Sequence, residues 1–211
     1  MDGVSHLKMY PLLSIFSKPR ATMRFLLNNR GLYRGLFFLI VVLAGVAEGF
    51  AETVDSLERW MLEVTPLWQI WLMVVISGVV AALFGLVFGA LLTLWVGRLF
   101  GGKGTYRELI VALGWAHLPL ALSLVLIPLN VWLYGDNLFL LDGVPIQEGL
   151  WATIAVFVEL VGSFAPYVFY LFLTLSFVAE AHRFTIGRAV ATLFLPLVVI
   201  LVLVILVYSL I

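Results

Sequence analysis

Cysteine is absent from this sequence of 211 residues, and charged residues make up only 11% of it. The lack of cysteine excludes disulfide bonds, thiolate metal sites and a cysteine nucleophile. A soluble domain carries about a quarter charged residues, so this chain cannot cover a core with a polar surface. With 64% hydrophobic residues and a mean hydropathy of +1.15, the composition predicts an integral membrane protein.

Five apolar segments reach or approach the length of about 20 residues that a helix needs to cross a bilayer. We therefore predict an all-α membrane protein, a bundle of five transmembrane helices preceded by an amphipathic interfacial N-terminal arm. The predicted domains are the basic arm at 1–32 and the five-helix domain at 33–211. Its spans are expected near 33–50, 67–100, 109–134, 150–179 and 189–211. The sequence leaves the structure of the outer loop at 135–149 open.

The N-terminal arm has the pattern of a segment that lies in the headgroup region. Pro11 and Pro19 each suit the first position of a helix, which predicts two short helical pieces. In the second piece, Met23 faces one way while Arg20 and Arg24 face another, as in an interfacial amphipathic helix.

Basic residues are segregated to one side of the predicted bundle. The arm, the 98–108 loop and the 180–188 loop hold all of them except Arg59, and the positive-inside rule assigns this face to the cytoplasm. An odd number of spans then places the C-terminus outside, in a multi-pass protein of the cytoplasmic (inner) membrane. The opposite face carries the acids Glu48, Glu52, Asp55, Glu58, Glu63, Asp136, Asp142 and Glu148.

A glycine-rich turn at 97–104 separates the second and third predicted spans and contains the pattern Gly-x4-Gly-Lys. A phosphate-binding loop needs a preceding strand and a serine or threonine directly after the lysine. Here a transmembrane helix precedes the turn and Gly104 follows Lys103. We interpret the segment as a flexible cytoplasmic turn whose Lys103 meets lipid phosphates. Thr105 and Glu108 form a capping box that starts the third span.

Small residues recur at every fourth position of the second span, which places them along one stripe where another helix can approach closely. Two interpretations remain open: packing against another span of the same chain, or a homodimer seam. The stripe consists of Ser77, Ala81, Gly85, Gly89, Thr93 and Gly97.

Glu159 is the acid placed well inside a predicted span, where an ionised carboxylate is costly and therefore expected to be protonated, paired or hydrated. His117 is the histidine inside the third span. If the third and fourth spans pack antiparallel, the two side chains fall within about one or two helical turns of each other in depth. They form a candidate intramembrane polar site, used either as a relay or substrate site or as a hydrogen bond that fixes helix packing.

Catalytic motifs are missing, since the sequence contains neither His-Glu-x-x-His nor Gly-x-Ser-x-Gly. We expect no enzyme, no catalytic residues, no metal and no cofactor. Glu180 and His182 are expected at the inner membrane boundary, solvated or touching headgroups. Anionic lipid rather than nucleic acid explains the basic residues, and the predicted headgroup contacts are Lys18, Arg20, Arg24, Lys103 and Arg107.

Three stretches of the chain occur in a fixed order among the five predicted spans. They are PLLSIFSKPRAT at 11–22, GGKGTYREL with ALGWAHLP at 101–119, and AEAHRFT at 179–185. Together they resemble bacterial Yip1-domain membrane proteins over nearly the whole chain. The resemblance implies a small polytopic protein, some of whose relatives accompany membrane transport systems. Eukaryotic members are trafficking factors that contact small GTPases and each other. Residues 114–119 resemble their Gly-Tyr-x-x-x-Pro element with Trp for Tyr, whereas their Asp-Leu-Tyr-Gly-Pro element has no good counterpart here.

Two functions fit these observations. The first is a polytopic membrane adaptor or scaffold that acts through helix–helix and membrane-surface contacts, accessory to a transport or lipid-handling complex. The alternative is a small transporter or channel for a lipid, an ion or an apolar solute that uses Glu159 and His117. The expected partners are membrane lipids, further copies of the chain and a membrane transport complex, with no nucleic acid.

Overall fold

A computed structural model describes residues 11–54, 57, 59–140 and 144–210 of the chain. Within these ranges the secondary structure is helical, and the sole β-type pairing is an isolated bridge between Leu57 and Leu140. Several residues named from the sequence, among them Asp55, Glu58 and Asp142, lie outside the described residues.

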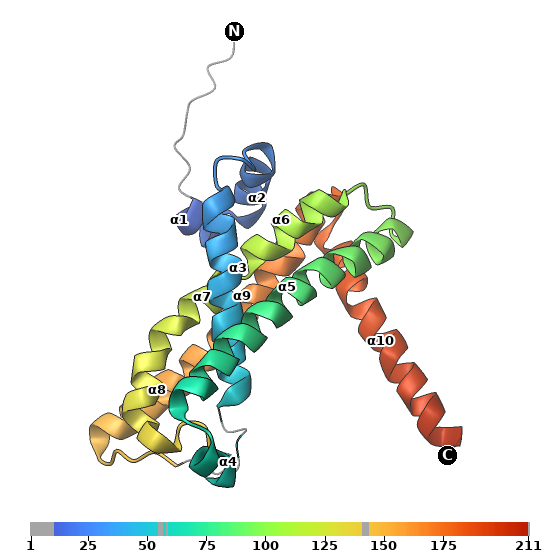
Figure 1. The fold of residues 1–211 in the computed structure, drawn as a ribbon. Coiled ribbons are helices and arrows are strands. Elements are labelled where there is room, and N and C mark those ends of the chain that lie inside the picture. The colour runs from blue at the N-terminus through green and yellow to red at the C-terminus, as the bar shows by residue number, and fades with distance from the viewer. Residues whose placement is uncertain (1–10, 55–56, 58, 141–143, 211) are drawn as a thin grey trace. The chain divides into compact units, whose positions relative to one another are not determined.

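Five helical segments of the described chain are long and apolar enough to cross a membrane, so the prediction of an all-α membrane protein with five such helices is confirmed. They are α3 (Arg34–Thr53), α5 (Leu67–Leu99), the run Tyr106–Asn137, α9 (Leu150–His182) and α10 (Ile186–Leu210). Figure 1 shows α5 as an uninterrupted helix, and α9 is one helix over its whole range. The first segment extends three residues beyond its predicted end, and α9 likewise.

The N-terminal arm forms two short helices, α1 (Pro11–Ser17) and α2 (Pro19–Asn28). The second begins at the proline that the sequence indicated, and the first is described from Pro11 onward. On α2, Met23 is fully buried while Arg24 is exposed, so the amphipathic pattern is confirmed for this helix. A further short helix, α4 (Arg59–Val64), precedes α5.

The third apolar segment is broken rather than continuous. It consists of α6 (Tyr106–Ala116), α7 (Leu118–Leu122), a 3-10 turn at Ser123–Leu126, α8 (Ile127–Tyr134) and a second 3-10 turn at Gly135–Asn137. Pro119 and Pro128 stand at the beginnings of α7 and α8, where a proline's missing N–H costs least. The segment therefore changes its helical geometry at membrane depth, where backbone groups need partners within the protein.

The chain divides into two compact units. Unit 1 comprises residues 1–34, 90–113 and 173–211, and unit 2 comprises residues 35–89 and 114–172. The unit boundaries fall at the start of α3 and within α5, α6 and α9, so each of the last three helices contributes one part to each unit.

Close backbone contact between α3 and α5 holds unit 2 together. A Cβ atom built on Gly78 would collide with the carbonyl group of Gly45 and lie 2.9 Å from the Cα of Gly49. Glycine is required at this contact because a side chain would force the helices apart. Near the start of α5, Trp71 stacks on Phe50 with ring centroids 5.7 Å apart, and Phe139 meets both rings edge-on.

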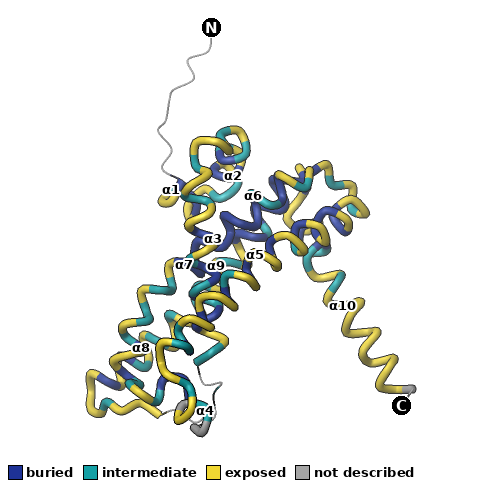
Figure 2. The backbone as a smooth tube through the Cα atoms, in the orientation of Figure 1, coloured by how far each residue is buried: buried dark blue, intermediate teal, exposed yellow. Residues whose placement is uncertain are grey.

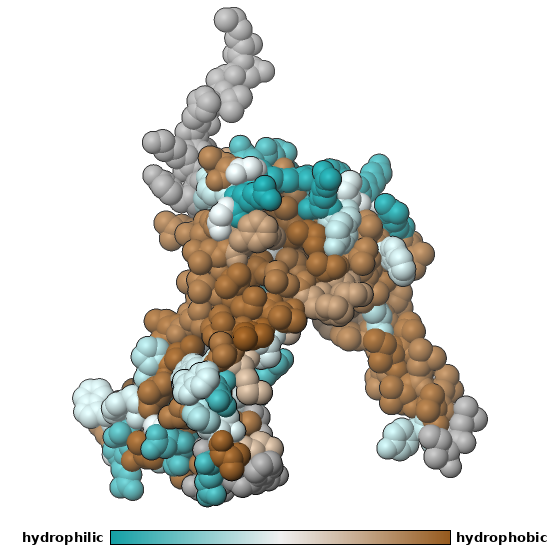
Figure 3. Space-filling view, viewed as in Figure 1, coloured by the Kyte–Doolittle hydropathy of each residue, from teal (hydrophilic) through white to brown (hydrophobic). Residues whose placement is uncertain are grey.

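Much of the apolar surface of the described residues is exposed, as expected where lipid is the solvent. Every described side chain from Leu197 to Ser209 of α10 is exposed, which Figure 2 shows as a yellow run along this helix. Figure 3 shows the same helix as hydrophobic along most of its length. In water such a surface would drive aggregation, whereas lipid tails are as apolar as the helix itself.

Candidate functional site

A cavity of about 240 Å³ lies within unit 2, bordered by α3, the broken third segment and α9. Its wall is mostly apolar, with five polar side chains among the lining residues: Glu48, Ser123, Asn130, Glu159 and Ser163, together with the phenol of Tyr167. None of the lining residues is basic. The cavity therefore combines two carboxyl groups with apolar walls and offers no cationic side chain to neutralise them.

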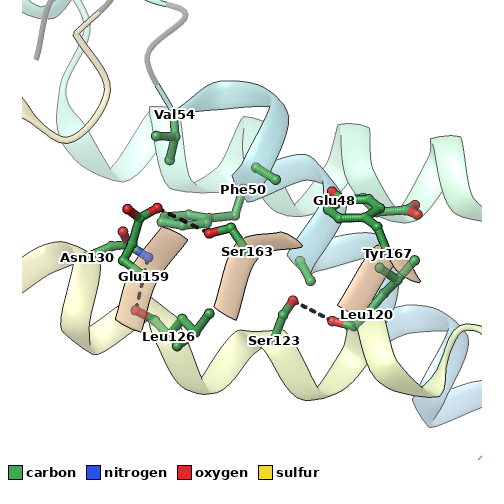
Figure 4. Close-up of a pocket in the computed structure, with 12 residues that line it drawn as sticks. Glu48, Phe50, Val54, Leu120, Ser123, Leu126, Asn130, Glu159, Ser163 and Tyr167 are labelled. Carbon is green, nitrogen blue, oxygen red and sulfur yellow. Dashed lines mark hydrogen bonds between the residues drawn. The ribbon is translucent and has the colours of Figure 1, made fainter. Parts of the chain in front are cut away.

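Local hydrogen bonds hold the side chains of Ser123 and Asn130 at the cavity (Figure 4). The Ser123 hydroxyl donates to the Leu120 carbonyl at 2.7 Å, and the Asn130 amide donates to the Leu126 carbonyl at 3.1 Å. The Leu126 carbonyl lies in the 3-10 turn and the Leu120 carbonyl lies in α7 just before it, so both side chains bond to the backbone near the point where the third segment leaves regular α-helix. These groups are therefore explained by structure and need no ligand.

The two carboxyl groups remain as the chemically distinctive part of the cavity. The Ser163 hydroxyl donates to Oε1 of Glu159 at 3.1 Å, one helical turn further along α9. Glu48 extends from α3 beside Tyr167, away from Glu159 (Figure 4). A pair of acids without a base favours a proton or a cation as the species that such a cavity would accept.

His117 lies elsewhere in unit 2. Its ring is buried and meets the ring of Tyr170 edge-on, with centroids 5.0 Å apart. Tyr170 follows Glu159 on α9 by three helical turns, a rise of about 16 Å. His117 does not line the cavity that contains Glu159. The structure therefore does not bring the two residues together, and their joint functional role stays a prediction.

The predicted small-residue stripe of α5 does not lie on one buried face. Ser77, Ala81 and Gly85 are exposed, and a Cβ atom on Gly85 would meet nothing within 4 Å. The helix packs against α3 through a neighbouring stripe that includes Gly78 instead. Of the remaining members, Gly89 is half-buried, while Thr93 and Gly97 are buried in unit 1.

In unit 1 the glycine-rich turn wraps around the imidazole of His182. The end of α5 has the hydrogen bonds of a Schellman motif: the Gly102 N–H reaches the Gly97 carbonyl at 2.8 Å, and the Gly101 N–H reaches the Arg98 carbonyl at 3.0 Å. Gly101 has φ +79°, which glycine adopts without strain. This motif turns the chain back toward the last turn of α9.

Glycine is also needed where the turn touches the ring. A Cβ atom on Gly97 or Gly102 would collide with ring atoms of His182, and one on Gly104 would lie 3.0 Å from Nδ1. The Gly104 N–H donates to Nδ1 at 3.2 Å, and Nε2 lies 3.1 Å from the Thr93 carbonyl. Because Nδ1 accepts, the proton of the neutral ring resides on Nε2 and is donated to that carbonyl.

Three sequence expectations are corrected in this region, those for His182, for the turn and for Glu180. The side chain of His182 is 0% exposed rather than solvated, because the turn encloses it. The turn itself is anchored, since the Lys103 N–H also donates to the His182 carbonyl at 3.0 Å. Glu180, expected to be solvated or to touch headgroups, is only 9% exposed.

Of the predicted headgroup contacts, Arg20 and Arg24 are engaged within the protein. Nε of Arg20 lies 3.1 Å from one Glu180 oxygen, and Nε of Arg24 lies 2.7 Å from the other. The hydrogen bond to Glu180 and its negative charge raise the pKa of Arg24 above its ordinary value. Lys18, Lys103 and Arg107 are exposed. Contact of all five residues with lipid stays a prediction.

The capping box at the start of α6 is confirmed and extended. Glu108 accepts from the Thr105 N–H at 2.8 Å, and the Thr105 hydroxyl accepts from the Glu108 N–H at 3.3 Å. The other Glu108 oxygen binds Arg183 at 2.8 Å and lies 3.4 Å from Arg30. Sequence reasoning missed this second role, although an acid within the basic 98–108 loop was a usable signal.

The family model named Yip1 domain matches residues 13–208 of the chain. No curated protein and no solved structure matches the chain significantly.

Proposed function

This chain belongs to the Yip1 domain family of membrane proteins, and from that premise we propose that it is a multi-pass membrane adaptor or scaffold. Its partners are membrane lipids and the transmembrane helices of a second copy or of a transport or lipid-handling complex. The proposal includes the absence of catalytic activity and of a nucleic-acid partner. It also places the protein in the cytoplasmic (inner) membrane, with its N-terminus in the cytoplasm and its C-terminus outside.

The outward stripe of α5 carries this proposal. Ser77, Ala81 and Gly85 are small, exposed and spaced by four residues, so a partner helix can come close to the α5 backbone along this line. The contact of α5 with α3 uses Gly78, which leaves the outward stripe available. The small residues within the chain therefore do not all serve to pack its own helices.

A bulky substitution on this stripe tests the adaptor proposal. Gly85→Leu adds a side chain where nothing lies within 4 Å, so the fold should be retained while close approach of a partner helix is blocked. Native mass spectrometry of the tagged protein, gently extracted at natural expression level, should show loss of the partner or second copy. Gly187→Leu is the matched control because a Cβ atom at Gly187, on α10, also meets nothing. Unchanged assembly in a normally expressed Gly85→Leu protein would contradict the proposal.

A second candidate function is transport, favoured by the acidic cavity of unit 2. Two carboxyl groups, Glu48 and Glu159, line it without a basic partner, and one of its walls is a broken helical segment. Broken helices in transporters often line substrate sites at membrane depth. Because the lining contains carboxyl groups and no basic side chain, the transported species proposed here is a proton or a cation rather than an anion.

Proton and potassium flux into liposomes containing the protein tests this alternative. Glu159→Gln should reduce the flux, because it removes a titratable carboxyl group from the cavity while preserving the side-chain shape and the hydrogen bond from Ser163. Glu148→Gln, an exposed acid outside the cavity, is the control. Absence of flux, or equal flux in both variants and the unchanged protein, would exclude the transport function.

A further inference from the structure

A second cavity, of about 560 Å³, lies within unit 1 between the arm helix α2, the start of α6 and the end of α9. Its charged lining residues are four arginines and two glutamates, which leave two positive charges in excess: Arg20, Arg24, Arg30, Arg183, Glu108 and Glu180. The cavity is large enough for a small polar ligand or the headgroup of a lipid.

Each glutamate in this cavity is already shared by two arginines. Glu180 pairs with Arg20 and Arg24 on α2, one helical turn apart, at 3.1 and 2.7 Å. Glu108 pairs with Arg183 at 2.8 Å and with Arg30 at 3.4 Å. The carboxylates thus fix the positions of the guanidinium groups but cannot neutralise all of them.

Several guanidinium donors remain for a ligand. Among the described residues, Arg24 donates only through Nε, which leaves both of its terminal nitrogens without a hydrogen-bond partner. Arg20 uses Nε on Glu180 and Nη2 on the Phe184 carbonyl, so its Nη1 is also available. Planar, fixed guanidinium groups with adjacent free N–H donors match the oxygens of a phosphate or carboxylate.

The backbone at Arg183 supplies an independent observation. The end of α9 is another Schellman motif, in which the Phe184 N–H bonds to the Ala179 carbonyl at 3.0 Å and Arg183 has φ +57°. Glycine is the usual residue in this left-handed position, and another residue there is strained. Having arginine rather than glycine at this position puts a guanidinium group at the cavity wall, where it pairs with Glu108. A glycine at 183 would supply no side chain there.

We propose that this arginine cavity binds a phosphate monoester. A monoester carries a charge of about −1.5 to −2 at neutral pH, which matches the two positive charges in excess. Its three terminal oxygens can accept hydrogen bonds from several guanidinium groups at once, whereas a diester has fewer such oxygens and a single negative charge. The inference concerns unit 1 alone and does not depend on the adaptor or transport function of the stripe and cavity in unit 2.

Binding of glycerol 3-phosphate to the full chain in phosphatidylcholine nanodiscs tests the soluble form of this ligand, with glycerophosphocholine as the diester comparison. Phosphorus NMR line broadening should show the monoester bound in preference to the diester. Arg183→Gly removes one of the four guanidinium groups of the cavity, whose Nη atoms already bond to Glu108 and to the Lys103 and Ala181 carbonyls. It should weaken monoester binding about tenfold or more through the lost positive charge, while the backbone gains a residue suited to φ +57°. Arg24→Lys keeps the positive charge but loses the planar set of guanidinium N–H donors, so it should weaken monoester binding less than Arg24→Gln, which loses both.

The lipid form of the ligand is tested by counting retained lipids in native mass spectra after reconstitution with equal fractions of phosphatidic acid and phosphatidylglycerol. Arg188→Gln is the matched control, since it removes an exposed positive charge that does not line the cavity. Monoester binding in the soluble experiment alone identifies a free phosphomonoester as the ligand, and preferential retention of phosphatidic acid alone identifies a headgroup. No preference for the monoester in either experiment, or an equal loss in Arg188→Gln and Arg183→Gly, would overturn the proposal.

Discussion

The effect of Gly97→Ala on stability should reverse its sign when His182 is removed. Gly97 is a helical residue near the end of α5, and the three heavy atoms nearest to a Cβ built on it all belong to the His182 ring. Two of them, Cε1 and Cδ2, would lie at 2.6 and 2.9 Å. No backbone atom of another segment is among the three, so the obstacle to alanine at this position is the imidazole.

The size of the reversal follows from two opposing effects. Overpacking a filled site costs about 1–3 kcal/mol, while replacing glycine by alanine in a helix gains about 1 kcal/mol. With His182 present, Gly97→Ala should therefore lower stability by up to about 2 kcal/mol. In a His182→Ala background the obstacle is gone and only the helical gain of about 1 kcal/mol remains. The coupling energy between the two sites should then be about 1–3 kcal/mol.

Two measurements on the full chain in detergent micelles test this double-mutant cycle of Gly97→Ala and His182→Ala. Circular dichroism during heating gives the midpoint temperature of unfolding, and trypsin cleavage after the exposed Lys103 reports release of the turn at native temperature. His182→Ala alone should increase that cleavage, because the Gly104 N–H and the Thr93 carbonyl lose their partner. Gly187→Ala is the control, since a Cβ atom there meets nothing.

The reasoning would be refuted if Gly97→Ala changed the midpoint by the same amount with and without His182. The glycine would then be required for a reason other than room for the imidazole. If His182→Ala does not fold, the comparison of Gly97→Ala with Gly187→Ala still decides the point, because equal effects at the two glycines would also contradict a filled site at Gly97.

Three further predictions follow from contacts described above. Gly78→Leu should abolish folded protein in micelles, as judged by aggregation in size-exclusion chromatography, because its side chain would enter the backbone of α3, whereas Gly85→Leu should still elute as folded protein. Glu108→Gln should lower stability to heating by about 1–2 kcal/mol, since it weakens the capping box and removes the charge that two arginines share. Glu180→Gln should increase trypsin cleavage within the arm while leaving the long helices protected, because this carboxylate holds α2 by two arginines.

Hydropathy and local capping signals allowed most of the fold to be predicted from the sequence. The length and the apolar composition of each segment predict a span. The prolines of the arm predict its two short helices. The capping box of Thr105 and Glu108 is equally local, since its two members are three residues apart. Signals of this kind are available because the physical cause and its structural effect lie in the same stretch of chain.

The candidate sites were harder to predict because their members are distant in sequence. The turn residue Gly104 and His182 are 78 positions apart, and Arg24 and Glu180 are 156 positions apart. The packing face of α5 was also hidden. This helix is apolar on all sides, so its periodicity does not distinguish the face that contains Gly78 from the one that contains Gly85. Only the three-dimensional contact separates them.

The enclosure of His182 by an earlier turn has a consequence for the biogenesis of the protein. Translation proceeds at about 5–20 residues per second, so the 78 positions between Gly104 and His182 correspond to about 4–16 s of synthesis. During that interval the finished turn at 97–104 has no imidazole to close around. A nascent chain arrested before the fourth span is complete should therefore be cleaved after Lys103 by proteases that the mature protein resists. Closure of this turn thus reports that the fourth span has been synthesised.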